Sequence, residues 1–384
     1  MVQMARFRNF SFRARVSLKL PGFFIVCAVV AYCEIFSFSV CCWQWSKLSS
    51  ASEDDLRILF VADPQLVGLR DESRLLGAIT RWDCDKYLQF GFFHAVGHVR
   101  PHVVVFLGDL LDEGSVATDD EFMTYVRRFH RVFRMPTNVK SVFASGDNDV
   151  GGEGSDSKQQ WKLNRFAKHF EDYRARGNCS MCVSSVKHVS FQKMSFDFGE
   201  RISQLHIDML SDVRMHSTAR YRIICNHMPL LSRLPVEIAK IIEILQPHLI
   251  VTAHTHLFKL YRCSDCRPYE SSENANKRQP AGKGETVNVK DLPRPLSFNL
   301  SDVLQLHELV IPTCSYRMGV PDMGYGAAVI SKNGQMKFDI LWLPSRYRQL
   351  KFYVIILSLI ALWLLMTRLY RYAKIGYNML IDMN

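Results

Sequence analysis

Five short apolar runs of this chain end in a carboxylate or an imidazole, and no other feature constrains the fold as strongly. Each run has the length of a buried strand. Stretches with helical periodicity lie between them, at residues 86–100, 120–133 and 159–173. Strands that alternate with helices predict an α/β fold, in which groups at the carboxyl ends of the strands share one crevice. The runs with their terminal groups occupy residues 57–63, 103–109, 142–149, 221–227 and 249–256.

The terminal groups of these runs form a set that suits divalent metals. Carboxylates favour harder ions, and imidazoles favour transition metals. Two ions about 3.5–4 Å apart need a bridging acid and two sets of terminal ligands, and this set is large enough. A single Gly-Asp after a strand is usually a turn, so the prediction depends on the complete series. The set comprises Asp63, Gln65, Asp109, Asp147, Asn148, His227, His254 and His256.

The order of these residues resembles the calcineurin-like metallophosphoesterases, whose pattern is D-x-H, G-D-x-x-D, G-N-H-D/E, a lone histidine and G-H-x-H. The resemblance covers roughly residues 57–343 and implies a layered αββα sandwich with a dinuclear metal site. Two local sequences, GDLLDEG at 108–114 and PTCSYR at 312–317, are similar to the branch that remodels glycosylphosphatidylinositol (GPI) anchors in the secretory pathway. The matching segments are 63–65, 108–112, 146–149 and 253–256, together with His227.

The resemblance implies a role for each of these positions. Asp109 would bridge two divalent ions, for which the family suggests manganese, and Asp112 would hold the turn. Asp147 stands where the family has an asparagine ligand. The metal ligands implied in this way are Asp63, Gln65, Asp109, Asp147, His227, His254 and His256, with Asn148 and Asp149 at the catalytic positions.

Two positions depart from the family pattern. Gln65 replaces the first histidine, and its amide oxygen can still coordinate a hard ion, though less strongly. Asn148 stands where the family has a histidine that stabilises or protonates the leaving group. Loss of a general acid costs about 10²–10⁴-fold in rate. We expect Asp149, Glu153 or a substrate with a good leaving group to compensate.

Two apolar segments flank this pattern. Residues 21–46 carry Glu34 as their only charge, and residues 352–367 carry none. The first segment is long enough to cross a hydrocarbon core of roughly 30 Å. The second is short for a span, but Lys351 and Arg368 could reach the two interfaces. The alternatives are a cleaved signal peptide for the first segment and a buried core helix for the second.

The net charge of +11 is explained by where the basic residues lie. Basic flanks stay in the cytosol, so both tails are expected there and the middle of the chain in a lumen. We therefore expect a membrane protein and no nucleic-acid partner, although the basic residues at 346–351 oppose this topology. The predicted parts are a cytoplasmic tail at 1–20, a transmembrane helix at 21–46, a lumenal metallophosphoesterase domain at 56–345, a transmembrane helix at 350–368 and a cytoplasmic tail at 369–384.

Cysteines and glycosylation sequons are compatible with a lumenal domain. The pairs Cys179/Cys182 and Cys263/Cys266 are too far apart in sequence for the usual zinc ribbon, so local disulfides are favoured over zinc or free thiols. The sequons at Asn178 and Asn299 give weak further support, because such tripeptides also arise by chance.

The resemblance implies an enzyme, a phosphodiester hydrolase that removes ethanolamine-phosphate from a mannose of the GPI anchor. Its partners would be GPI-anchored proteins and the membrane, its location the endoplasmic reticulum or Golgi, and its role to promote transport between them. Two alternatives stay open: an active lumenal phosphoesterase with another substrate, and a catalytically silent cargo adaptor with the same fold. The three imidazoles argue against the adaptor, since a decaying site has little reason to keep them.

Overall fold

A computed structural model shows that the chain consists of two compact units. One unit is Cys42–Leu343, and the other combines Met1–Cys41 with Pro344–Asn384. The structure describes residues 22–48, 52–70, 72–73, 75–170, 182–196, 204–215, 219–234, 236–264, 266, 284–302 and 304–382.

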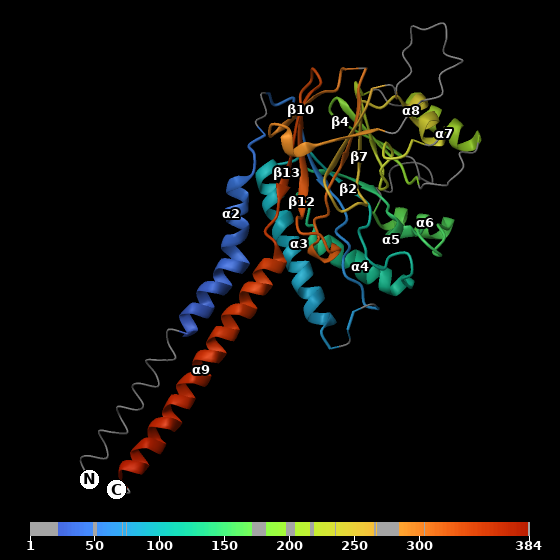
Figure 1. Ribbon diagram of the computed structural model, residues 1–384. Coiled ribbons are helices and arrows are strands. Elements are labelled where there is room, and N and C mark those ends of the chain that lie inside the picture. Colours follow the sequence, from blue (N-terminus) through green and yellow to red (C-terminus); the bar gives the residue numbers. More distant parts are fainter. Residues whose placement is uncertain are drawn as a thin grey trace. The chain divides into compact units, whose positions relative to one another are not determined.

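The first sheet of the larger unit has six strands in the order β10-β13-β12-β1-β2-β3 (Figure 1). Strands β1, β2 and β3 are parallel, whereas β12 is antiparallel to β1. Phe60 in β1 lies opposite Val105 in β2 and Gly326 in β12. The strands are β1 (Leu56–Val61), β2 (Val103–Leu107), β3 (Lys140–Ala144), β10 (Leu296–Asn299), β12 (Gly324–Ile330) and β13 (Gln335–Trp342).

The second sheet has seven strands in the order β4-β5-β6-β7-β11-β8-β9. Its centre, from β5 through β6 and β7 to β11, is parallel. The strands are β4 (Cys182–Val186), β5 (Val189–Lys193), β6 (Tyr221–Cys225), β7 (Leu249–Thr252), β8 (Lys259–Cys263), β9 (Glu285–Val287) and β11 (Leu306–Val310).

The two sheets pack against each other around one apolar core. Alternate residues of β1, such as Ile58 and Phe60, join this core together with Phe191 of β5 and Ile223 of β6. A period of two is expected where one face of a strand meets the opposite sheet. The prediction of an α/β fold with two sheets at its centre is therefore confirmed.

Helices cover the outer faces of both sheets (Figure 1). Phe92 of α3 and Phe129 of α4 pack on Phe106 of β2, with ring centroids 6.3 and 5.2 Å apart. On the second sheet, Ile242 of α8 joins a cluster with Ile224 of β6. The layers are thus helix, sheet, sheet and helix. The helices are α3 (Gly77–Val99), α4 (Asp119–Val132), α5 (Asp147–Val150), α6 (Gln160–Phe170), α7 (Gln204–Met215) and α8 (Val236–Leu245), with 3-10 turns at Val289–Asp291 and Tyr316–Met318.

One pair of the expected disulfides is present. Cys263 at the end of β8 is bonded to Cys266. Cys179 and the side chain of Cys182 lie outside the described residues, as does Asn178. Asn299, the other sequon, ends β10 and is exposed.

The smaller unit contains two long apolar helices. By length and composition alone, Gly22–Gln44 and Arg346–Ile381 could both cross a membrane. The first includes a π-helical turn, Tyr32–Phe36, followed by α2 (Ser37–Gln44), and α9 runs over Arg346–Asp382. Arg346 and Tyr353 of α9 both donate to Glu34 Oε1, at 2.8 and 2.7 Å. This ion pair explains how the first helix accommodates its single charge.

Candidate metal centre

The predicted ligands come from the carboxyl ends of five strands, where loops of both sheets meet. Asp63 follows β1, Asp109 follows β2, and Asp147 begins α5 after β3. His227 follows β6 and His254 follows β7 in the other sheet. Parallel strands bring their carboxyl ends to one edge, so residues distant in sequence gather there.

Hydrogen bonds across the junction join the two sheets at this edge. His227 Nδ1 lies 2.8 Å from the carbonyl oxygen of Leu107, at the end of β2. The backbone N–H of His254 donates to Asp63 Oδ1 at 3.3 Å. Thr313 donates its hydroxyl to the carbonyl of Asp63 at 2.7 Å. The ligands are therefore held by a continuous network rather than by separate loops.

Five of the predicted ligands have a left-handed backbone. Non-glycine residues rarely adopt positive φ, and such conformations cluster at functional sites. The values are 45° for Asp63, 37° for Gln65, 49° for Asp109, 66° for His254 and 60° for His256.

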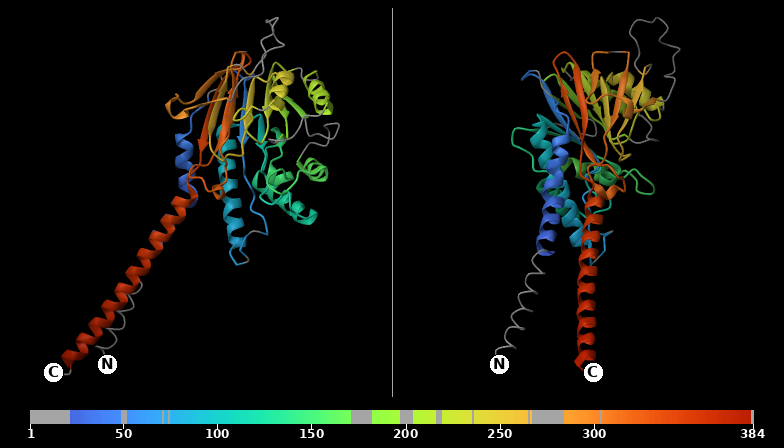
Figure 2. Two further views of the ribbon diagram at one scale, coloured as in Figure 1. Left: turned by 45° about the vertical axis from the view of Figure 1, so that its right-hand side comes forward. Right: turned by 60° about the vertical axis from the view of Figure 1, so that its left-hand side comes forward.

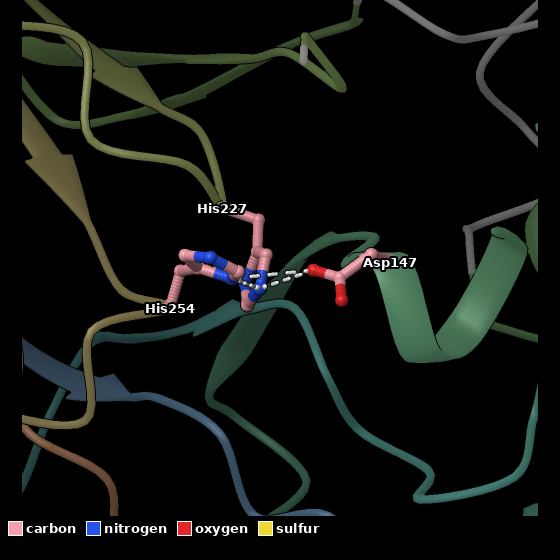
Figure 3. A group of neighbouring side chains, drawn as sticks. All are labelled: Asp147, His227 and His254. Carbon is pink, nitrogen blue, oxygen red and sulfur yellow. Dashed lines mark hydrogen bonds and ion pairs between the residues drawn. The ribbon is translucent and has the colours of Figure 1, made fainter. Parts of the chain in front are cut away.

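A first group of possible ligands consists of Asp147, His227 and His254 (Figure 3). His227 Nε2 lies 3.0 Å and His254 Nδ1 3.3 Å from Asp147 Oδ1. The two imidazole nitrogens are 3.2 Å apart. Three ligand atoms that point at one another in this way can hold a cation between them.

A second group consists of Asp63, Asp109 and His227. Asp63 Oδ1 lies 3.8 Å from His227 Nδ1, and Asp109 Oδ1 lies 3.5 Å from His227 Nε2. Within each group one ligand atom per residue lies within 4.8 Å of the others. Because His227 belongs to both groups, the two candidate positions are adjacent.

The charge of this cluster fits a cation. Asp63, Asp109 and Asp147 are at most 8% exposed. Among the described residues, Asp63 Oδ2 is a buried oxygen without a hydrogen-bond partner. Burial raises the pKa of Asp63 to about 7. Burial and then the Asp147 carboxylate raise the pKa of Asp109, against the opposing effect of His227. Buried carboxylates that repel one another are stabilised by a metal ion or, without one, by protons.

The same carboxylates change the pKa values of the histidines. Burial lowers the pKa of His227, but Asp109, Asp147 and Asp63 together raise it well above its usual value. Burial opposes ionisation of Asp147, yet hydrogen bonds from His227 and His254 lower its pKa. Only neutral imidazole coordinates a metal, so metal binding at this site must release protons.

Gln65 and His256 lie at the border of this cluster. Gln65 Nε2 is 3.0 Å from Asp109 Oδ2, an orientation that a rotation of the amide would reverse. Burial and then the neighbouring His254 and His227 lower the pKa of His256 to about 4. His256 is therefore neutral near pH 7 and chemically suited to be a ligand.

The two residues expected at catalytic positions are placed differently from each other. Asn148 is partly buried, and its backbone N–H donates to Asp109 Oδ1 at 3.0 Å. Asp149 is fully buried and accepts hydrogen bonds from the N–H groups of Gly146, Leu110 and Leu111, at 3.0 to 3.2 Å. This placement favours a structural role for Asp149, because its carboxylate is engaged by three backbone N–H groups and has no exposed surface, while the catalytic role stays a prediction. Asp149 connects the loops after β2 and β3.

Two supporting acids were not anticipated from the sequence. Glu308 in β11 is fully buried and accepts from the N–H groups of Leu230 and Leu231, both at 2.7 Å. Glu113 is 3% exposed and accepts from the N–H of Leu69 at 3.0 Å. A lone charge inside the apolar run LHELV was the available signal for Glu308. Glu113 lies in the GDLLDEG segment, which itself gives no sign that this side chain is buried.

The fold and this site together define a metallophosphoesterase. Residues 56–258 match the family model described as calcineurin-like phosphoesterase. That match spans more than half of the chain, and the chain belongs to the calcineurin-like phosphoesterase family. The metal-binding groups support a phosphoesterase that uses divalent metal.

Two similar proteins are named Metallophosphoesterase 1 or its homolog. The chain is 30% identical over 174 residues to a Metallophosphoesterase 1 homolog of Drosophila melanogaster, covering 44% of each. It is 30% identical over 184 residues to Metallophosphoesterase 1 of Danio rerio, covering 47% of this chain and 45% of the relative. The chain thus spans less than half the length of these relatives. A purple acid phosphatase from yellow lupin seeds is 10% identical, with a TM-score of 0.48, over 79% of this chain and 56% of the lupin chain.

Proposed function

We propose that this protein is a membrane-anchored phosphodiesterase that uses two metal ions to remove ethanolamine-phosphate from a mannose of the GPI anchor. The observation that carries the proposal is the pair of adjacent Asp/His groups that share His227. Two neighbouring cation positions suit the clamping of a phosphoryl oxygen. The two apolar helices support an anchor, and an anchored domain is close to a lipid-tethered glycan.

We assign the side chains of the site to two metal positions. When bound, divalent ions supply Lewis-acid activation of water and neutralise charge on the phosphoryl group. Asp63, Asp109 and His227 would hold one ion, and Asp147 with His254 would complete the other position. Manganese is the metal that we propose, because the carboxylate-rich set favours a harder ion than an all-imidazole set would.

Protonation of the leaving oxygen needs a group other than Asn148. Glu153 is the best candidate, since it is exposed and its carboxyl shares a hydrogen bond with Asp147. That bond and the Asp147 charge raise the pKa of Glu153. A carboxyl group with a raised pKa at the rim of the site is suited to act as a general acid.

The wider role follows from the substrate. We propose a lumenal orientation in the endoplasmic reticulum or Golgi, GPI-anchored proteins as cargo, and promotion of their transport as the outcome. The disulfide between Cys263 and Cys266 supports an oxidising compartment, since such bonds rarely persist in the cytosol.

Phosphodiesterase activity of the purified full-length chain tests the proposal. The protein is stripped of metal, given back manganese, and assayed on a soluble phosphodiester and on a GPI glycan fragment, beside Asp109→Ala. Manganese-dependent loss of ethanolamine-phosphate that disappears in the variant is the expected result. Turnover of the soluble ester alone would favour another substrate. Tight metal binding without turnover of either would favour the adaptor.

A further inference from the structure

We propose that the exposed apolar start of α3 docks on the surface of the lipid bilayer and holds the metal-site edge of the domain beside it. This inference rests on the membrane anchorage and lipid-linked substrate proposed above. We call Leu75, Leu76, Ile79 and Trp82 the α3 tip.

Helix α3 extends beyond the sheets at its N-terminal end (Figure 2). Tyr325 donates its hydroxyl to the carbonyl of Leu88 at 3.4 Å. Tyr325 pairs with Leu341 in the adjacent strand, and Gly326 beside it pairs with Phe60 near the end of β1. Leu88 is therefore level with the carboxyl end of β1. The helix extends from there by 11 residues to Gly77, which is roughly 16 Å at 1.5 Å per residue.

The composition of the tip is unusual for a protein surface. Leu75 is 89% exposed, and Leu76, Ile79 and Trp82 are each exposed by 61 to 63%. These side chains lie opposite the buried face of the helix, which includes Cys84. Large apolar side chains that gather on one exposed face mark an interaction surface.

Charged groups around the tip suit a membrane interface. Lys86 Nζ lies 5.2 Å from the centre of the Trp82 ring. Tryptophan with lysine beside it is the combination enriched where helices meet lipid headgroups. Three acids near the tip that the structure describes are engaged with the domain instead: Asp83 accepts from Tyr316, Asp85 pairs with Arg128, and Glu72 pairs with Arg317. The exposed face of the tip is thus apolar and basic.

The attachment of the apolar helices favours a bilayer as the partner, over a second copy of the chain. Trp45, the residue after α2, donates its indole N–H to the carbonyl of Trp342 at 2.8 Å. Trp342 ends β13 and pairs with Gly324, at the same edge of the sheet as Asp63. On the other side, α9 begins three residues after Leu343, a reach of only about 10 Å. Both apolar helices are therefore connected to the domain by short segments of chain at the edge of the sheet that carries Asp63.

Docking would position the active site as well as the domain. The segment from Asp63 to the tip is pinned at Leu69 and Arg70, whose N–H groups donate to Glu113 at 3.0 Å. Glu113 lies in the loop that follows Asp109. Contact between the tip and lipid would thus hold both metal-binding loops at the surface from which a lipid-anchored phosphodiester projects.

Quenching by brominated lipids tests the contact without any need for activity. The full-length protein is reconstituted in vesicles with and without brominated phosphatidylcholine, and the quenched fluorescence is compared with that of Trp82→Phe. Trp161→Phe is the matched control, because Trp161 is 49% exposed on α6. We expect Trp82→Phe to remove a quenched component that Trp161→Phe leaves in place. Equal effects of the two changes would overturn the proposal. So would Trp82 emission that responds to protein dilution instead of bromine, which would assign the tip to a second copy.

Turnover of two substrates tests the consequence. Leu75→Asp with Leu76→Asp places charge on the tip at the start of α3, where carboxylates favour a helix, so the fold is preserved. This variant should keep wild-type turnover of a soluble phosphodiester and lose most turnover of a phosphodiester presented on vesicles. Equal turnover of both would refute the docking role. Absence of turnover in the wild type would refute the proposed function. The quenching experiment would still test the contact between the tip and lipid, because it does not depend on activity.

Discussion

Replacing Gly108 by alanine should disrupt the metal centre through one added methyl group. Gly108 forms the turn between β2 and Asp109 with a φ of 93°. A Cβ there would lie 2.7 Å from the backbone nitrogen of Gly146 and 2.7 Å from Nδ1 of His227. Neither atom can yield easily, since His227 is 3% exposed and its Nδ1 lies 2.8 Å from a carbonyl oxygen. The methyl group must displace the imidazole that both ligand groups share.

The magnitude follows from two costs. The left-handed backbone costs an alanine about 1–2 kcal/mol, and overpacking of a buried site costs about 1–3 kcal/mol. We therefore expect a loss of about 2–5 kcal/mol in the free energy of unfolding. For a domain of this size the midpoint should fall by roughly 2–4 °C per kcal/mol. Affinity for manganese should fall at least about 10–100-fold, as when a ligand loses its supporting contacts.

Thermal unfolding of the metal-free protein and calorimetric titration with manganese measure the two effects. Gly97→Ala is the matched control, because a Cβ at Gly97 in α3 meets no atom within 4 Å. That change should stabilise the helix by about 0.5–1 kcal/mol. If Gly108→Ala unfolded with the wild-type midpoint and bound manganese with wild-type affinity, the turn would be able to relax and the reasoning would be wrong.

Three further predictions concern the same edge of the sheets. Asn148→His restores the family pattern and should raise kcat up to about 100-fold on esters with poor leaving groups, with little change on good ones; a rise of equal size on both would exclude a general-acid role. Asp149→Ala leaves three buried N–H groups without their acceptor and should destabilise the fold by about 3–5 kcal/mol, measured by denaturant unfolding; a stable but inactive variant would return Asp149 to catalysis. Burial raises the pKa of Glu308 from 4.5 to about 7, so the folded state binds more protons, and the stability that Glu308 contributes is lost as pH rises through that window. Melting curves of Glu308→Gln across this range should therefore show a flatter dependence on pH than the wild type, and an unchanged slope would contradict the assignment.

The positions of the carboxylates and imidazoles were predictable because they depend on a local rule. An apolar run that ends in Asp63 or Asp109 identifies a strand and its carboxyl end, and parallel strands bring those ends together. The same rule applied to His227 and His254 in the second sheet. The prediction needed no knowledge of how the two sheets pack.

Other features depend on packing that a local pattern does not contain. Asp149 is adjacent in sequence to Asn148, but the turn at the start of α5 directs it into the interior. Residues 204–215 form α7, and its Leu210 packs in the cluster beneath α8. The helix at the start of α3 begins nine residues before the expected position, in a stretch whose exposed face is apolar. The contacts that bury Asp149 and Leu210 are tertiary, so the local pattern does not contain them.

The left-handed backbone of the ligand residues has a consequence for a molecule that loses its metal. Hydrogen bonds within the protein, such as that from the Gln65 N–H to the Asp109 carbonyl at 2.9 Å, contribute to holding these loops. Protons can replace the missing positive charge, because the pKa of Asp63 lies near 7. A molecule that loses its ions would thus become dormant while staying folded, and would regain activity once metal returned. The supply of metal would then act as a reversible control on the amount of working enzyme, with no need for new synthesis.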